Sequence, residues 1–211
     1  MNKTYSKTYE ILHDVTKLYF DWVGPGFEPL LSPVVKGDEG DSEDPTRPCR
    51  FWLWPASANG KHHCYEGGLA QHTLEVMQLA KSMSESPVYA GKIDPVVLAT
   101  GALWHDIGKI DEYREPEVIA KRGDMIQHWH RTTTAKHGLT HIVTGLMRWG
   151  FPTRAPLSRT QHEQVAHLIA SHHGRLEWGS PVTPVDAAAL ILHQADMLSV
   201  LADSGLNPQN R

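Results

Sequence analysis

The sequence predicts an all-α fold, and three observations support this prediction. Apolar residues recur near the helical period of 3.6 in several long segments, glycine or proline stands at the ends of most of them, and no strand-like alternation of useful length is present. We therefore expect a helical bundle with an N-terminal helix and an acidic loop. The expected helices span residues 5–22, 69–83, 95–106, 139–149, 159–173 and 183–202.

Local signals place the ends of these helices. Asp94 followed by Pro95 is a favourable start, because an aspartate accepts hydrogen bonds at the N-cap and proline suits the first helical position. The segment from Ser158 to Gln161 fits a capping box. Gly150 and Gly174 follow the last residues of two helices, where glycine commonly ends a helix.

The length of 211 residues favours one domain. Residues 36–48 carry several carboxylates among glycine, serine and proline, and this composition predicts a mobile acidic loop. We therefore expect residues 1–50 to form the N-terminal helix and this loop, residues 51–203 to form the domain, and residues 204–211 to be a C-terminal tail.

Composition excludes several classes of protein. The chain has 20 Lys and Arg against 24 Asp and Glu, and a net charge of -4 does not favour passive attraction to nucleic acid. Two cysteines exclude a disulfide framework. No apolar run approaches the ~20 residues that cross a bilayer, and the N-terminus has no signal-peptide core. We expect a cytoplasmic protein without a membrane partner, whose oligomeric state stays open.

Histidine is the unusual component, with 14 residues in 211. An unpaired buried charge costs several kcal/mol, whereas a pair of divalent metals accounts for polar residues in apolar helices, because imidazole and carboxylate bind Mn, Fe, Zn or Ni. His162 and His167 are excluded as a zincin-like pair, because residues five apart lie on different helix faces. The candidate ligands are His72, His105, Asp106, His141, His172, His173 and Asp196.

The order of these residues resembles a known family. His72, His105-Asp106 and Asp196 match the His…His-Asp…Asp pattern of the HD superfamily of metal-dependent phosphohydrolases. The surrounding segments resemble the catalytic HD domain of YhaM-type 3′–5′ exoribonucleases, at residues 62–74, 105–109, 138–142, 171–181 and 192–196. Residues 55–69 are also similar to the HD-type region of relaxases from integrating conjugative elements.

The resemblance implies a metal-dependent phosphohydrolase with two divalent metal ions, which could be Mn, Fe, Ni, Zn or Mg. It places the first ion on His72, His105, Asp106 and Asp196, and the second on Asp106, His141, His172 and His173. A metal-bridging hydroxide would then attack phosphorus. Asp106 and Lys109 are the candidate catalytic residues, because a cation beside the metals stabilises the developing charge.

The resemblance also implies a phosphodiester substrate in single-stranded nucleic acid. His63, Glu177 and Trp178 are the candidates for contact with it, and an aromatic ring such as Trp178 can stack on a base. A packing or metal-orienting role for His62 and His63 is the other interpretation. His137 shares a helix face with His141 and is a further candidate ligand.

Two other functions stay open at this point. The first fifty residues show a helix and a loop in place of the OB module of those exoribonucleases, and together with the net charge this is compatible with a nucleotide or cyclic-nucleotide phosphohydrolase. The other is a non-catalytic regulatory HD module of a mobile element with a structural metal site. The complete ligand series and Lys109 argue against that module.

Overall fold

The computed structural model describes residues 3–36, 50–57, 61–114, 117–121, 124–131, 138–150 and 156–205. Most of them are helical, so the predicted fold class is confirmed. Two 3-10 helices, η1 (Pro25–Phe27) and η2 (Leu176–Trp178), and two strands, β1 (Glu117–Lys121) and β2 (Asp124–His128), complete the described elements. The α-helices are α1 (Lys3–Val23), α2 (Glu28–Lys36), α3 (Arg50–Leu53), α4 (Gly68–Ser84), α5 (Pro95–Trp104), α6 (Lys109–Glu112), α8 (His141–Trp149), α9 (Arg159–Ser171) and α10 (Ala187–Gly205).

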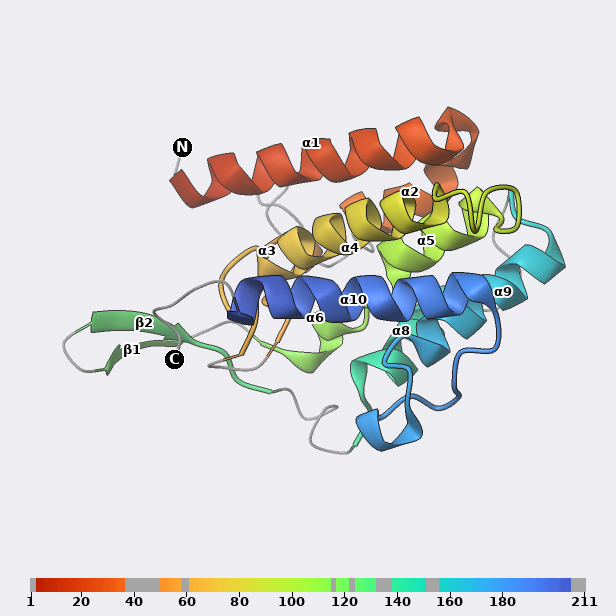
Figure 1. The fold of residues 1–211 in the computed structure, drawn as a ribbon. Helices are drawn as coiled ribbons and strands as arrows, with labels where there is room; N and C mark the ends of the chain where they lie inside the picture. The colour runs from red at the N-terminus through yellow and green to blue at the C-terminus, as the bar shows by residue number, and fades with distance from the viewer. Residues whose placement is uncertain are drawn as a thin grey trace.

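The long helices pack along one another (Figure 1). α4 packs against α10, α1 and α5, and α5 also packs against α9. α8 contacts α9 and the short α6. The hairpin of β1 and β2 extends away from the helical body. No helix in the described part of the chain is long and apolar enough to cross a bilayer.

α5 is surrounded by other helices because it is apolar on every side. Its residues from Val97 to Trp104 are all buried, and a helix without a polar face is stable only where neighbours cover it. The Trp104 indole N–H donates to the Leu30 carbonyl at 2.8 Å and so connects α5 to α2. α5 begins as predicted, because the Asp94 side chain accepts hydrogen bonds from the first helical N–H groups.

α9 begins at the predicted residue and ends two residues before the predicted end. Ser158 accepts from the backbone N–H of Gln161, and the Gln161 side chain accepts from the backbone of Ser158, which confirms the capping box. The helix ends at Ser171, His172 is its C-cap, and Gly174 follows with φ of 80°. His172 and His173 therefore lie in the turn that closes the helix.

The structure contains elements that the sequence did not predict. β1 and β2 pair antiparallel with Ile119 opposite Ile126, and a bridge joins Tyr113 to Arg131. Neither strand alternates polar and apolar residues, because apolar residues are adjacent at 118–120 in β1 and at 125–126 in β2. α2 was missed because Pro33 lies inside it, and proline usually interrupts a helix.

Residues 37–48 of the predicted acidic loop lie outside the described residues, and so do residues 206–211 of the expected tail. α1 packs against α4 and α5, so the N-terminal helix contacts the bundle. The expected domain boundaries stay predictions.

We expect Gly108→Ala to lower stability, because its turn lies against the start of α8. A Cβ at this position would lie 2.0 Å from the His141 carbonyl oxygen and 2.5 Å from the Gly145 nitrogen. Overpacking of this kind costs about 1–3 kcal/mol. Urea unfolding measures the loss, and Gly26→Ala is the matched control, because its Cβ meets nothing within 4 Å. An unchanged urea midpoint for Gly108→Ala would contradict the close approach.

Candidate metal centre

The structure brings all the predicted metal ligands of the described chain to one place. His72 lies within α4 and Asp196 within α10, whereas the other ligands lie at helix ends. At such an end the chain leaves the helical path, so neighbouring side chains are no longer forced ~100° apart. The helix-end ligands are His105 and Asp106 after α5, His141 at the start of α8, and His172 and His173 after α9.

Asp106 lies at the centre of the group and is 2% exposed. Its Oδ2 atom lies 3.5 Å from Nε2 of both His72 and His105. Its Oδ1 atom lies 3.3 Å from Nε2 of His141 and 3.6 Å from Nε2 of His172. The two oxygens of one carboxylate thus face two different sets of histidines.

Each set is compact enough to hold an ion. His72, His105 and Asp196 offer ligand atoms that lie within 4.8 Å of one another, and Asp196 Oδ1 is 3.1 Å from His72 Nε2. The ligand atoms of the second set also lie within 4.8 Å of one another. That second set is His141, His172 and His173.

The hydrogen bonds of the histidines assign their protons. In each of the five histidines Nδ1 has a hydrogen-bond acceptor as its partner, so the ring proton lies on Nδ1. The Nε2 lone pair then stays available for a metal ion. The Nδ1 partners are Ser199 Oγ for His72 (2.9 Å), Ala102 O for His105 (2.8 Å), Glu112 Oε2 for His141 (3.2 Å), Ile169 O for His172 (2.8 Å) and Trp178 O for His173 (2.7 Å).

Three atoms at the centre are buried without a hydrogen-bond partner among the described residues. They are Asp106 Oδ1, His141 Nε2 and His172 Nε2. Each unsatisfied buried polar atom costs about 1–3 kcal/mol. A divalent cation is the group that satisfies an oxygen and two imidazole nitrogens at once, so the residues present fit a metal ion.

The pKa values of the group favour the ligand forms at neutral pH. Burial lowers the pKa of His105 to about 3 and of His173 to about 4, so both imidazoles are neutral. Burial alone would raise the pKa of Asp106, but Lys109 and the surrounding histidines lower it well below its usual value. His172 is the exception, because Asp106 raises its pKa against the effect of burial. A proton on His172 therefore competes with a metal ion.

Comparison with known families decides the relationship of this chain. The profile of the HD domain family matches residues 69–201, which hold every candidate ligand. The chain belongs to the HD domain family.

Several curated relatives of this HD domain are named 3′–5′ exoribonuclease YhaM. The 3′–5′ exoribonuclease YhaM of Bacillus subtilis is 29% identical over 207 residues, and that of Bacillus licheniformis is 30% identical over 209. The YhaM protein of Listeria monocytogenes is 24% identical over 204 residues. Each comparison covers 96% of this chain but 56% of the relative, so the chain spans about half the length of these proteins. No solved structure matches the chain.

Glu75 supports the first ligand set of the HD domain, and the sequence analysis missed it. Ser199 Oγ accepts from His72 Nδ1 and donates to Glu75 Oε2 at 2.7 Å. His63 Nε2 donates to the same carboxylate at 3.1 Å, and Gln71 Nε2 donates to its other oxygen at 2.9 Å. The spacing of three residues from His72 to Glu75 on one helix was the signal that could have revealed it.

Glu112 supports the second set in the same way and was also missed. It is 5% exposed, accepts from His141 Nδ1 and pairs with Arg131 beyond β2. Burial alone would raise the pKa of Glu112, but the hydrogen bond from His141 and the charge of Arg131 lower it. Lys109 lies three residues after Asp106, and Glu112 lies three residues after Lys109. This regular spacing was the signal for Glu112 in the sequence.

The turn of His172 and His173 is fixed from α10. His193 Nδ1 donates to the His172 carbonyl at 2.8 Å, and a Cβ at Gly174 would lie 2.4 Å from the His193 ring. His193 therefore holds the backbone of a candidate ligand.

A pocket of about 310 Å³ opens beside the second ligand set, within the usual size of small-ligand sites. Lys109 lines it, pairs with Asp106 at 2.7 Å and donates to the Ala56 carbonyl. The lining also includes Lys61, His62, Arg131, His141, His173 and Trp178.

The other predicted substrate residues differ in their placement. Trp178 lines the pocket and is 46% exposed. Glu177 is exposed on η2 and His63 is buried, and neither is among the described residues that line the pocket. The sequence analysis named His63, yet its neighbour His62 reaches the pocket. His137 lies outside the described residues.

We expect Mn²⁺ to raise the melting temperature of the metal-free protein, because the ion binds the folded site and not the unfolded chain. At 100 times the dissociation constant the stabilisation is ~2.7 kcal/mol, or roughly 5–10 °C for a chain of this size. Differential scanning fluorimetry measures the shift. His172→Ala should reduce the shift, and His13→Ala, at an exposed residue of α1, should leave it intact. A wild-type protein that shows no shift would contradict the metal centre.

We expect Glu75→Gln to be less stable than the wild type by about 1 kcal/mol at pH 7. Burial alone would raise the pKa of Glu75, but the hydrogen bonds from His63, Ser199 and Gln71 lower it to about 2. A lowered folded-state pKa contributes stability above the unfolded-state value of 4.5, and this contribution is lost as pH falls toward 2. The difference in unfolding free energy should therefore shrink below pH 4.5.

Urea titrations of both proteins at pH 7, 5 and 3.5 test this pH dependence. Glu163→Gln, at an exposed position of α9, is the control. A difference between wild type and Glu75→Gln that grows as the pH falls would have the wrong sign.

Proposed function

We propose that this HD domain is a phosphodiester hydrolase that holds two divalent metal ions and shortens single-stranded nucleic acid from its 3′ end. The observation that carries the proposal is the buried carboxylate of Asp106, whose two oxygens face separate sets of histidine Nε2 atoms. A single ion does not need two such sets, whereas a bridging carboxylate between two ions does.

The ligands divide between the two ions. His72, His105 and Asp196 would hold one, and His141, His172 and His173 the other, with Asp106 shared between them. When bound, the ions supply a water of lowered pKa and positive charge beside the phosphate.

The side chains of the pocket bind and orient the substrate. Lys109 places its ammonium group between Asp106 and the pocket, where a negative charge develops during the reaction. Trp178 offers an exposed ring at the pocket and is itself held by Arg175, whose guanidinium lies 4.8 Å from the ring centre. A base can stack on such a ring whatever its identity.

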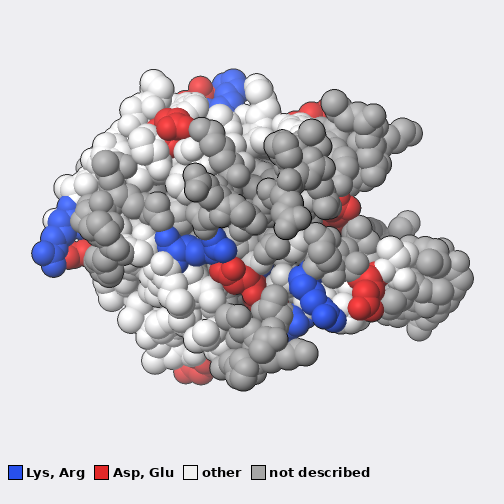
Figure 2. Space-filling model, turned by 180° about the vertical axis from the view of Figure 1, so that it is seen from behind, with Lys and Arg blue, Asp and Glu red and all other residues white. Residues whose placement is uncertain are grey.

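Charge favours a small phosphate-binding site rather than a broad nucleic-acid face. Lys61, Lys109 and Arg131 line one pocket of a chain whose net charge is -4. On the face drawn in Figure 2 the coloured basic side chains lie beside acidic ones and form no broad basic patch. The positive charge near the candidate ligands is therefore local.

The relatives support the choice of nucleic acid and the direction of cleavage. They are named 3′–5′ exoribonucleases, and the chain spans about half of their length. The names of these relatives do not favour the nucleotide phosphohydrolase or the regulatory module, and both are outcomes of the experiment below. The cytoplasmic location stays a prediction.

We expect the protein with Mn²⁺ to shorten a 5′-labelled single-stranded oligonucleotide stepwise. Asp106→Asn should lower the rate by roughly 10³-fold or more, because it removes several kcal/mol of transition-state stabilisation. Asp21→Asn is the matched control, since Asp21 is an exposed residue that pairs with Lys17 on α1. The products are resolved on a denaturing gel, and the bound metal is counted by elemental analysis.

Other outcomes point elsewhere. An intact oligonucleotide together with a hydrolysed mononucleotide would replace the proposal by a nucleotide phosphohydrolase. Bound metal without hydrolysis of either substrate would favour the regulatory module. A ladder that Asp106→Asn leaves unchanged would show that the cleavage comes from a contaminant.

A further inference from the structure

The chain holds the loop before α4 in a strained conformation, and the proposed hydrolysis does not use it. His63 has φ of 45° and is the one non-glycine residue with positive φ in the described part of the chain. Such a backbone costs about 1–3 kcal/mol and persists only where its surroundings fix it. Here the His63 N–H donates to Asp203 at 2.6 Å, its carbonyl accepts from Ala56 at 3.1 Å, and Ser57 donates to the His62 carbonyl.

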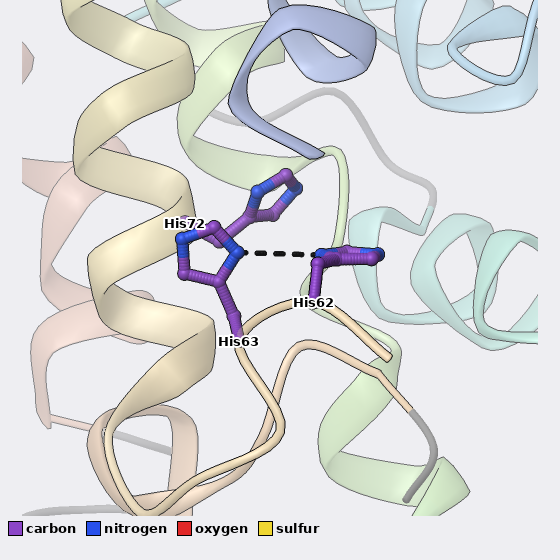
Figure 3. A group of neighbouring side chains, drawn as sticks. All are labelled: His62, His63 and His72. Atoms are coloured by element: carbon purple, nitrogen blue, oxygen red, sulfur yellow. Dashed lines mark hydrogen bonds between the residues drawn. The ribbon is translucent and has the colours of Figure 1, made fainter. Parts of the chain in front are cut away.

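The side chains of this loop form a hydrogen-bonded chain that ends on Glu75. His63 is 1% exposed, and its Nε2 donates to Glu75 at 3.1 Å. With its proton on Nε2, His63 presents the Nδ1 lone pair to His62, whose Nδ1 lies 3.3 Å away and donates (Figure 3). The partners therefore assign the proton of His62 to Nδ1.

The other nitrogen of His62 is then an acceptor, and it belongs to a side chain that lines the pocket. Figure 3 shows this nitrogen on the side of the ring turned away from His63. His62 lines the pocket together with Lys109 and His141. No hydrogen bond joins Nε2 of His62 to the described part of the chain. His62 thus offers a lone pair, held in direction by a buried partner, to whatever occupies the pocket.

An acceptor in this position is unsuited to phosphate. Unprotonated phosphate oxygens only accept hydrogen bonds, and Lys61, Lys109 and Arg131 already provide donors for them. The donors that a strand carries whatever its bases are sugar hydroxyls, a 2′-hydroxyl on each ribonucleotide and a 3′-hydroxyl on the terminal nucleotide, and only the 3′-hydroxyl marks the strand end. Within a strand the 3′ oxygen is esterified and has no hydrogen, whereas at the 3′ end it is a hydroxyl group.

We propose that His62 Nε2 accepts a hydrogen bond from the terminal 3′-hydroxyl and so makes the pocket select strand ends over strand interiors. The inference rests on the proposed function and names the feature of the substrate that this site recognises. The side chain touches the substrate, and His63 and Glu75 act as positioning residues that fix the direction of its lone pair.

The first test uses the wild-type protein with Mn²⁺ and two labelled oligonucleotides that differ only in the last sugar. One ends in a 3′-hydroxyl and the other in a 3′-deoxy nucleotide. We expect kcat/KM for removal of the last nucleotide to be roughly five- to tenfold higher for the hydroxyl end, because one hydrogen bond is lost without it. Equal values overturn the inference.

A pair of variants assigns the preference to one nitrogen. His62→Asn keeps a donor at the position of Nδ1 and removes Nε2, so the preference should fall to about one. His62→Gln carries an amide oxygen to the position of Nε2 and should keep part of the preference. His13→Asn, an exposed histidine of α1, should keep all of it. A preference unchanged in His62→Asn, or a loss of bound metal in that variant, overturns the inference.

A binding measurement separates this inference from the proposed function. Metal-free protein is titrated with adenosine 5′-monophosphate and with its 3′-deoxy analogue, and tryptophan fluorescence reports the binding. Tighter binding of the 3′-hydroxyl form, lost in His62→Asn, supports the inference even if the wild type cleaves no oligonucleotide. Equal binding of the two nucleotides, or binding of neither, overturns it.

Discussion

The structure depends on a carboxylate that is charged and buried. Asp106 is 2% exposed, and an ionised group in such a place is tolerated only when positive charge or hydrogen-bond donors surround it. Lys109 supplies one cation at 2.7 Å, but Oδ1 is left without a hydrogen-bond partner in the described chain. Two of the histidines that converge here, His141 and His172, have Nε2 atoms that are equally unsatisfied among the described residues. The fold therefore carries an energetic deficit at its centre that divalent cations are suited to remove.

The helix ends set the orientation of the ligands as well as their position. His105 and His172 each donate from Nδ1 to the carbonyl three residues earlier, Ala102 in one helix and Ile169 in the other. The last turn of α5 thus orients the His105 ring, and the last turn of α9 orients the His172 ring. The two rings face different oxygens of Asp106. His72 and His141 depend instead on side chains, Ser199 and Glu112. Backbone carbonyls therefore orient two of these four histidines, and polar side chains outside the ligand set orient the other two.

The sequence could predict the features that depend on neighbouring residues, and it could not predict those that depend on tertiary contacts. The caps at Asp94 and Ser158 depend on neighbouring residues only, and both were predicted correctly. The ligand series was predictable because histidines and carboxylates are rarely placed among apolar helix positions without a reason. Glu75 and Glu112 had only their three-residue spacing as a sequence signal, and this signal is weak because a glutamate in a helix usually faces solvent. The tertiary contacts with Ser199 and Arg131 distinguish these two. The role of His62 was equally hidden, since it follows from which ring nitrogen the buried His63 engages.

Glu75 has a consequence that reaches beyond the support of a single histidine. One of its oxygens receives both the Ser199 hydroxyl, behind His72, and the His63 ring, behind His62. A shift of this carboxylate toward one partner weakens the other bond. Through this carboxylate an ion at the proposed first position and a ligand in the pocket would be linked thermodynamically, and the factor by which one changes the affinity of the other would then be the same in both directions.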